Sequence, residues 1–147
     1  MPGAGVADVP IWVLDTNVLV SGLLSPTGPP GRLVDALVAR HLMLALDDRI
    51  ELEYREVMSR PRLGIDAARR DAFLAMLQFQ IHVTAPAWRL RPPPDRDDVM
   101  FLEVAAMTAD RAVVSGNIKH FPAVCRGAVT VLSPRIAWKR LTAGPEL

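Results

Sequence analysis

The chain has 147 residues, half of them hydrophobic, and a formal net charge of +1. This length favours one domain with a real core, the apolar content excludes a disordered tail, and the near-neutral balance gives no global basic charge for nucleic-acid binding. Cys125 is the single cysteine, which excludes an intramolecular disulfide and a cysteine-based zinc site and fits a reducing cytoplasm.

The N-terminal residues differ in composition from the rest of the chain. We expect residues 1–10, which contain glycine and proline, to be a flexible segment before a single domain over 11–147. No signal peptide is recognisable, and the apolar runs further along are too short to span a bilayer, so we expect a cytoplasmic protein without a membrane partner. Residues 11–14 form a short apolar run that stops at Asp15, which predicts a buried strand with a carboxylate at its end.

The next segments alternate between helix and strand. A helix can occupy 16–24, and the prolines and glycines of 25–31 predict a loop after it. Apolar residues at helical spacing predict a helix over 32–40, and a second buried strand is predicted over 42–46.

A further helix is expected after the second strand. Asp48 can cap it, Glu51 completes a capping box three residues later, and the helix ends near Met58. An amphipathic helix over 66–80 and a third strand over 81–85 follow.

The last third of the chain continues the alternation. The prolines of 89–95 predict an extended connector, and Asp97 or Asp98 can cap the helix after it. Strands are predicted over 111–115 and 128–132, and a final helix starts at Ser133-Pro134. The whole order predicts an α/β fold with a mainly parallel sheet and helices on both faces.

Four polar positions, far apart in sequence, fall where such a sheet binds its ligands. Asp15 ends the first predicted strand, and Asn117 lies just beyond the fourth strand. Asp98 lies at the amino end of the helix that precedes the fourth strand, and Glu53 lies on the helix that follows the second strand. Ligands bind beyond the carboxyl ends of parallel strands, so these side chains could converge at one rim. Crowded carboxylates repel unless a cation lies between them, and oxygen ligands suit Mg²⁺ or Mn²⁺, which indicates phosphoryl chemistry.

Structural roles compete with this interpretation, and the residues alone leave both open. Capping and metal binding are about equally favoured for Asp98. Glu53 can be a solvated helix residue, with Glu51 and Glu56 as rival acids nearby. Asn117 can be an ordinary turn residue, because Asn tolerates a positive φ. His120 can reach the same rim, but no partnered nucleophile is evident, so we favour a non-catalytic role for it.

Several segments together resemble PIN-domain proteins and, more narrowly, the VapC-like toxin components of bacterial type II toxin–antitoxin systems. The resemblance covers nearly the whole chain from Ile11 onward. Four motifs agree in order and spacing, and a closing strand and helix follow them: residues 13–21, 53–61, 97–105 and 113–121, then 131–134.

The resemblance implies a compact three-layer α/β/α fold and RNA cleavage that depends on Mg²⁺ or Mn²⁺. Asp15, Glu53 and Asp98 match the family's metal-binding acids and are the implied catalytic residues, with Asp15 and Asp98 on the metal. Asp98 is preferred to Asp97 because it stands three residues before Phe101 in the matching pattern.

The remaining implied site residues support these acids. Asn117 is the further metal-binding residue that the resemblance implies. Many members of the PIN-domain family have a fourth Asp at this position, whereas the amide of Asn117 provides an oxygen ligand without a charge. This departure puts a second metal ion in doubt. Ser115 matches a small hydroxyl residue that lines the site, while Thr16 and Asn17 are expected to orient Asp15.

The resemblance also implies partners: an RNA substrate with accessible single-stranded loops, an antitoxin protein that occludes the acidic rim, and a second copy in a homodimer. Two other classes remain open. One is a PIN-like module that has lost catalysis and binds RNA or protein, which Asn117 favours. The other is a different α/β enzyme such as a phosphatase.

Overall fold

The sheet of the computed structural model confirms the predicted α/β class. The structure describes residues 9–143, so the expected flexible segment 1–10 lies outside the described residues except for its last two. Five strands pair in the order β3-β2-β1-β4-β5, and every neighbouring pair is parallel. They are β1 (Ile11–Leu14), β2 (Met43–Leu46), β3 (Ile81–His82), β4 (Ala112–Val114) and β5 (Thr130–Leu132).

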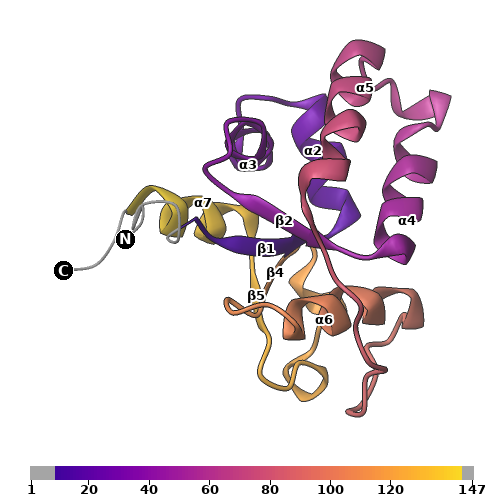
Figure 1. Ribbon diagram of the computed structural model, residues 1–147, viewed down its shortest axis with the longest axis vertical. Helices are drawn as coiled ribbons and strands as arrows, with labels where there is room; N and C mark the ends of the chain where they lie inside the picture. Colours follow the sequence, from indigo (N-terminus) through magenta and orange to yellow (C-terminus); the bar gives the residue numbers. More distant parts are fainter. Residues whose placement is uncertain (1–8, 144–147) are drawn as a thin grey trace.

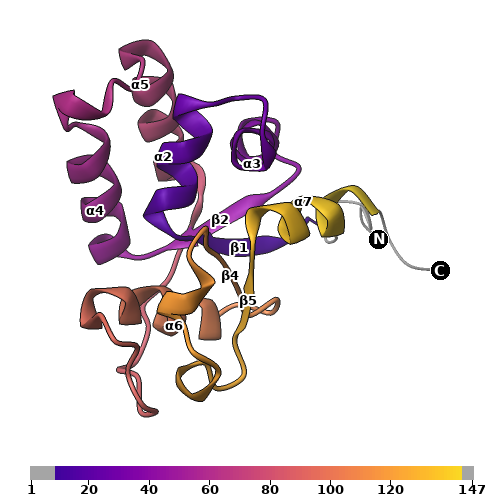
Figure 2. The same ribbon diagram turned by 180° about the vertical axis from the view of Figure 1, so that it is seen from behind.

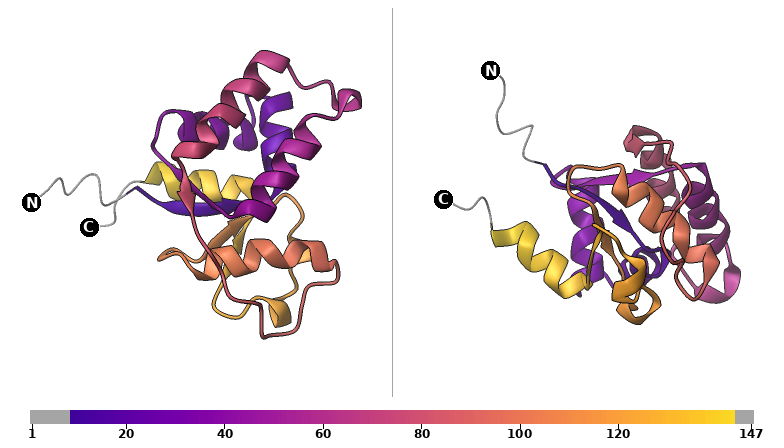
Figure 3. Two further views of the ribbon diagram at one scale, coloured as in Figure 1. Left: turned by 45° about the vertical axis from the view of Figure 1, so that its right-hand side comes forward. Right: turned by 90° about the horizontal axis from the view of Figure 1, so that it is seen from below.

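Helices cover both faces of this sheet and make three layers, as Figures 1 and 2 show from opposite sides. Helix α6 lies on one side, α2, α3 and α5 lie on the other, and α7 packs against α3 (Figure 3). The α-helices are α2 (Thr16–Leu24), α3 (Pro29–Val38), α4 (Asp48–Met58), α5 (Ala67–Met76), α6 (Val99–Ala106) and α7 (Pro134–Ala143). Short 3₁₀ turns connect them: η1 (Pro61–Leu63), η2 (Leu77–Phe79), η3 (Arg96–Asp98), η4 (Ile118–His120) and η5 (Ala123–Cys125).

The central strands are apolar on both faces because helices lie above and below them. Val13 and Leu14 of β1 and Val113 and Val114 of β4 are completely buried. Strands buried on both sides are near-continuous hydrophobic runs, which is why the run 11–14 identified β1. Asp15 follows directly after the buried end of this strand.

The loop predicted over 25–31 is wrong in its second half, because α3 begins at Pro29. Proline suits the first turn of a helix, where its missing N–H would have no intrahelical partner. The turn before it folds back tightly: a Cβ on Gly31 would lie 2.4 Å from the backbone of Pro26. Glycine is therefore required at this position by close contact.

The capping box predicted at Asp48 is also wrong. Asp47 is the cap of α4, and its Oδ1 accepts a hydrogen bond from the amide of Ile50 over 3.1 Å. Its other carboxylate oxygen pairs with Arg49. The helix therefore begins at Asp48, directly after β2 and its cap.

The helix predicted over 66–80 and the strand over 81–85 are both shorter than expected. Helix α5 ends at Met76 and continues as η2, and β3 has two residues. The side chain of Gln80 accepts a hydrogen bond from the amide of Leu44 over 3.0 Å. A side chain thus pairs with a backbone amide of β2 that a longer edge strand would pair with. The other predicted elements are present, with ends within three residues of those expected.

Candidate active site

The strand order places one pair of strand ends at the switch point of the sheet. The chain adds β2 and β3 on one side of β1 and then returns to place β4 and β5 on the other. In open α/β sheets ligands bind beyond the carboxyl ends of the strands at this point. Asp15 follows β1 and Ser115 follows β4, and the Asp15 amide donates to Val114 O over 2.8 Å. Sheet topology and sequence thus select the same rim.

Asp15 is buried at this rim and held by hydrogen bonds. It is 6% exposed, and its Oδ2 accepts a hydrogen bond from Ser115 Oγ over 2.8 Å. Burial raises the pKa of the Asp15 carboxyl, while hydrogen bonds from Ser115 and from the amides of Asn17 and Thr16 act in the opposite direction. Ser115 Oγ in turn accepts from the amide of Asn117 over 3.0 Å, which connects the turn after β4 to Asp15.

Glu53 reaches the same rim from helix α4, where Thr16 Oγ1 donates a hydrogen bond to its Oε2. Burial, and after it the negative charge of Asp15, raises the pKa of Glu53, so the two carboxylates lie close enough to repel. The Thr16 side chain therefore orients Glu53, while its amide serves Asp15. Asn17 contributes differently: its Oδ1 accepts from the amide of Gly116 over 3.2 Å and joins α2 to the turn after β4.

The Asp98 side chain is available as a ligand because it makes no capping hydrogen bond. Asp95 accepts a hydrogen bond from the amide of Asp97 over 2.9 Å, and the Asp98 side chain makes no capping bond to α6. Asp98 thus occupies the predicted N-cap position of α6 without a capping side-chain bond, and the carboxylate that caps is that of Asp95, before the 3₁₀ turn η3. Burial, and then the charge of Asp15, raises the pKa of Asp98 to about 6.

Asn117 and His120 complete the rim on the β4 side. Asn117 Nδ2 lies 2.9 Å from His120 Nε2, and His120 Nδ1 lies 3.7 Å from Asp98 Oδ2. The charge that protonated His120 carries lowers the pKa of both Asp98 and Asp15. The histidine thus contacts the acidic site, which sequence spacing only suggested.

Tyr54 is the residue at this site that sequence reasoning missed. Its side chain is completely buried, and its Oη donates a hydrogen bond to Leu14 O over 2.5 Å. A buried tyrosine needs a partner for its hydroxyl, but the sequence gives no sign of which carbonyl supplies it. Its position next to Glu53 on α4 was the available signal.

The donor set fits a divalent cation of the Mg²⁺ type. Its side-chain donors are oxygens, and within the described residues Asp98 Oδ2 is buried without a hydrogen-bond partner. Among residues 9–143, however, no group of three or more His, Cys, Asp or Glu side chains is arranged to hold a metal ion as it stands. Glu53 is bound to Thr16 and Asp15 to Ser115, so the carboxylates share a rim without forming a closed cluster.

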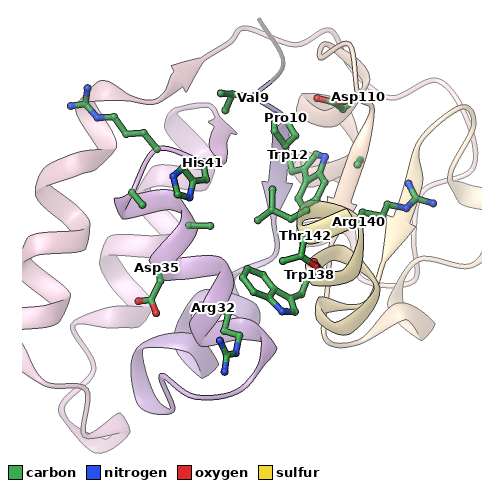
Figure 4. Close-up of a pocket in the computed structure, with 15 residues that line it drawn as sticks. Val9, Pro10, Trp12, Arg32, Asp35, His41, Asp110, Trp138, Arg140 and Thr142 are labelled. Carbon is green, nitrogen blue, oxygen red and sulfur yellow. The ribbon is translucent and has the colours of Figure 1, made fainter. Parts of the chain in front are cut away.

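A cavity among the described residues lies elsewhere, as Figure 4 shows. Its volume is about 830 Å³, and it opens between α3 and α7, beside the amino end of β1. Trp12 and Trp138 face it, and the Arg32 guanidinium lies 5.8 Å from the centre of a Trp138 ring. None of the acids at the rim lines this cavity, which is separate from the candidate active site.

Comparison with known proteins agrees with the fold and the rim. The PIN-domain family model matches residues 12–119, which is well over half of the chain and includes each of the acids described above. No curated protein and no solved structure matches the chain. In the part of the chain that the structure describes, none of the helices has the length and apolar character needed to cross a membrane. PIN domains are typically nucleases with a nuclease-type fold. By its matched sequence and its three-layer architecture, this chain belongs to the PIN-domain family.

Proposed function

We propose that the protein is a metal-dependent endoribonuclease that hydrolyses RNA phosphodiester bonds and acts as the toxin of a toxin–antitoxin pair. The observation that carries the catalytic part is the meeting of Asp15, Glu53 and Asp98 at the switch point of the sheet, where each of their pKa values is raised. Holding these charges together without a cation destabilises the fold. A function that uses a cation explains why they are held there.

Asp15 and Asp98 are the residues that would hold Mg²⁺ or Mn²⁺. Asp98 contributes the buried oxygen without a partner, and Ser115 fixes the orientation of Asp15. Asn117 can add its carbonyl oxygen, because its amide nitrogen is the atom that faces His120. When bound, the cation would polarise the phosphodiester and lower the pKa of a bound water.

In this proposal Glu53 accepts the proton of the attacking water. Thr16 holds Oε2, which leaves Oε1 as the oxygen that can face the water. A raised pKa brings a carboxylate closer to neutral pH and makes it a better base. In this step the water oxygen forms a bond to phosphorus, the bond to the leaving oxygen breaks, and the proton passes to Glu53.

The toxin role rests on the VapC-like resemblance and on surfaces that a partner would cover. An antitoxin that occludes the rim must meet an acidic surface, so a basic inserted side chain fits it. The homodimer rests on the same resemblance, since the exposed apolar side chains of Val38, Leu52, Phe79 and Val124 lie on four different elements. Growth arrest on expression, relieved by a neighbouring gene product, would test the toxin role.

A second candidate function is a PIN-like module with weakened catalysis that binds RNA or protein. Asn117 favours it, because an amide at this position brings no charge to the cation. Such a module would bind RNA but cleave it slowly at any Mn²⁺ concentration. Cleavage and binding must therefore be measured separately.

The test is cleavage of a mixed RNA pool by wild type, Asp15→Asn and Asp98→Asn, with Mn²⁺ and with EDTA. Asp71→Asn is the matched control, since Asp71 is exposed and lies on α5. We expect metal-dependent cleavage by wild type and the control, and a loss of at least about 100-fold in both site variants, as for a lost preorganised catalytic charge. RNA binding without cleavage by folded wild type would favour the binding module instead.

A further inference from the structure

We propose that Tyr54 is a positioning residue that sets the separation of Asp15 and Glu53 and so determines how tightly the rim binds its cation. This inference rests on the proposed function. It begins from a hydrogen bond that contacts neither acid directly: Tyr54 Oη donates to Leu14 O over 2.5 Å, in the buried layer beneath the rim.

The accepting carbonyl belongs to the peptide group that leads into Asp15. The carbonyl of this group is held by Tyr54 from α4, and its amide, that of Asp15, is held by Val114 O from β4 over 2.8 Å. A peptide group is planar, so fixing both ends fixes the direction in which the next Cα–Cβ bond leaves the strand. The orientation of Asp15 therefore depends on α4 as well as on the sheet.

A second contact joins the same two segments on the other side of Asp15. Thr16 Oγ1 donates to Glu53 Oε2, and Glu53 is the neighbour of Tyr54 on α4. Two consecutive helix residues thus contact Leu14 and Thr16, the two residues that flank Asp15. We call these two hydrogen bonds the α4 latch. The latch fixes one acid relative to the other through short, mostly buried contacts.

The chemistry of Tyr54 agrees with this positioning role. The side chain is completely buried, and burial together with the charges of Asp15 and Glu53 raises its pKa well above the usual value, so the hydroxyl stays protonated and donates. Packing alone would be satisfied by phenylalanine. The hydroxyl adds the hydrogen bond to Leu14 O. This bond also provides the partner without which a buried hydroxyl would destabilise the fold.

The test compares Tyr54→Phe with wild type in Mn²⁺ binding, followed by electron paramagnetic resonance, and in RNA cleavage. Residues that orient metal ligands change metal affinity or activity by about 10- to 100-fold when replaced. We expect the Mn²⁺ dissociation constant of Tyr54→Phe to rise about 10-fold, and kcat to fall by a similar factor while KM for RNA is unchanged. Thr16→Val should act in the same direction, and Thr16→Ser, which keeps the hydroxyl, should lose less Mn²⁺ affinity than Thr16→Val.

Thr108→Val is the matched control, because Thr108 Oγ1 also donates to a backbone carbonyl, that of Ala105, in a buried position away from the rim. The control should lower the melting temperature and leave Mn²⁺ binding unchanged. Unchanged Mn²⁺ affinity and kcat in Tyr54→Phe, or an equal loss of affinity in the control, would overturn the inference. Wild type that binds Mn²⁺ but does not cleave RNA would overturn the proposed function alone. The Mn²⁺ affinities of Tyr54→Phe and wild type would then still test the α4 latch.

Discussion

Replacing Asp98 by Asn should stabilise the metal-free protein at neutral pH. The Asp98 carboxyl is largely buried, lies near the charges of Asp15 and Glu53, and has a pKa raised from 3.8 to about 6. Its ionised form is therefore less favourable in the folded protein than in the unfolded chain. An amide of the same shape removes the charge and keeps the packing.

The pKa shift sets the size and the pH range of this effect. The rise in pKa from 3.8 to about 6 corresponds to about 3 kcal/mol at pH values above both pKa values, and we expect about 2 kcal/mol because the Asp98 side chain is 15% exposed. The folded protein binds the proton more tightly, so stability is highest below 3.8 and falls as pH rises through about 6. The penalty is complete at pH 7 and above.

Thermal unfolding in EDTA across a pH series measures this difference. For a chain of this size, 2 kcal/mol corresponds to a rise in melting temperature of roughly 4–8 °C. Asp98→Asn should gain this at pH 7.5 and nothing near pH 4, whereas Asp71→Asn, at an exposed position, should gain nothing at either. An Asp98→Asn melting temperature equal to or below wild type at pH 7.5, or a pH-independent difference, would refute the reasoning.

Two further substitutions test the local geometry. Gly31→Ala should lower the free energy of unfolding by about 1–3 kcal/mol in urea titration, because its Cβ would lie 2.4 Å from the backbone of Pro26; an unchanged midpoint would show that this turn shifts freely. Asn117→Asp should tighten Mn²⁺ binding in a calorimetric titration and lower the melting temperature in EDTA, because it adds a fourth carboxylate to the rim; unchanged affinity would place residue 117 outside the cation site.

The sequence predicted the parts of the fold that depend on local patterns. The apolar run 11–14 identified the central strand, with Asp15 directly after its end, because a strand buried on both faces has no room for polar side chains. The alternation of elements then predicted a parallel sheet. Convergence of Asp15, Glu53 and Asp98 on one rim followed from that topology, since parallel strands share a carboxyl edge.

Features that depend on tertiary contacts or on the exact start of an element could not be predicted. Pro29 was interpreted as part of a loop, although proline is accepted in a first helical turn and α3 uses it there. The capping carboxylate is that of Asp95, at the start of η3, and not that of Asp98 at the N-cap position of α6, because a three-residue turn has no periodic signal. The partner of Tyr54 is a carbonyl 40 positions away in sequence, so only the folded chain identifies it.

The β4 side of the rim shows how this chain limits the repulsion among its acids. An aspartate at position 117 would add a fourth negative charge, whereas Asn117 faces His120, whose own charge lowers the pKa of Asp98 and Asp15. The same repulsion is the free energy that a bound cation would relieve, so the amide stabilises the metal-free protein and weakens cation binding together. Neutral residues at all of these positions would stabilise the fold further. The repulsion among the three acids costs stability in the metal-free protein, and a bound cation would relieve it, which favours the proposed metal site over the binding module.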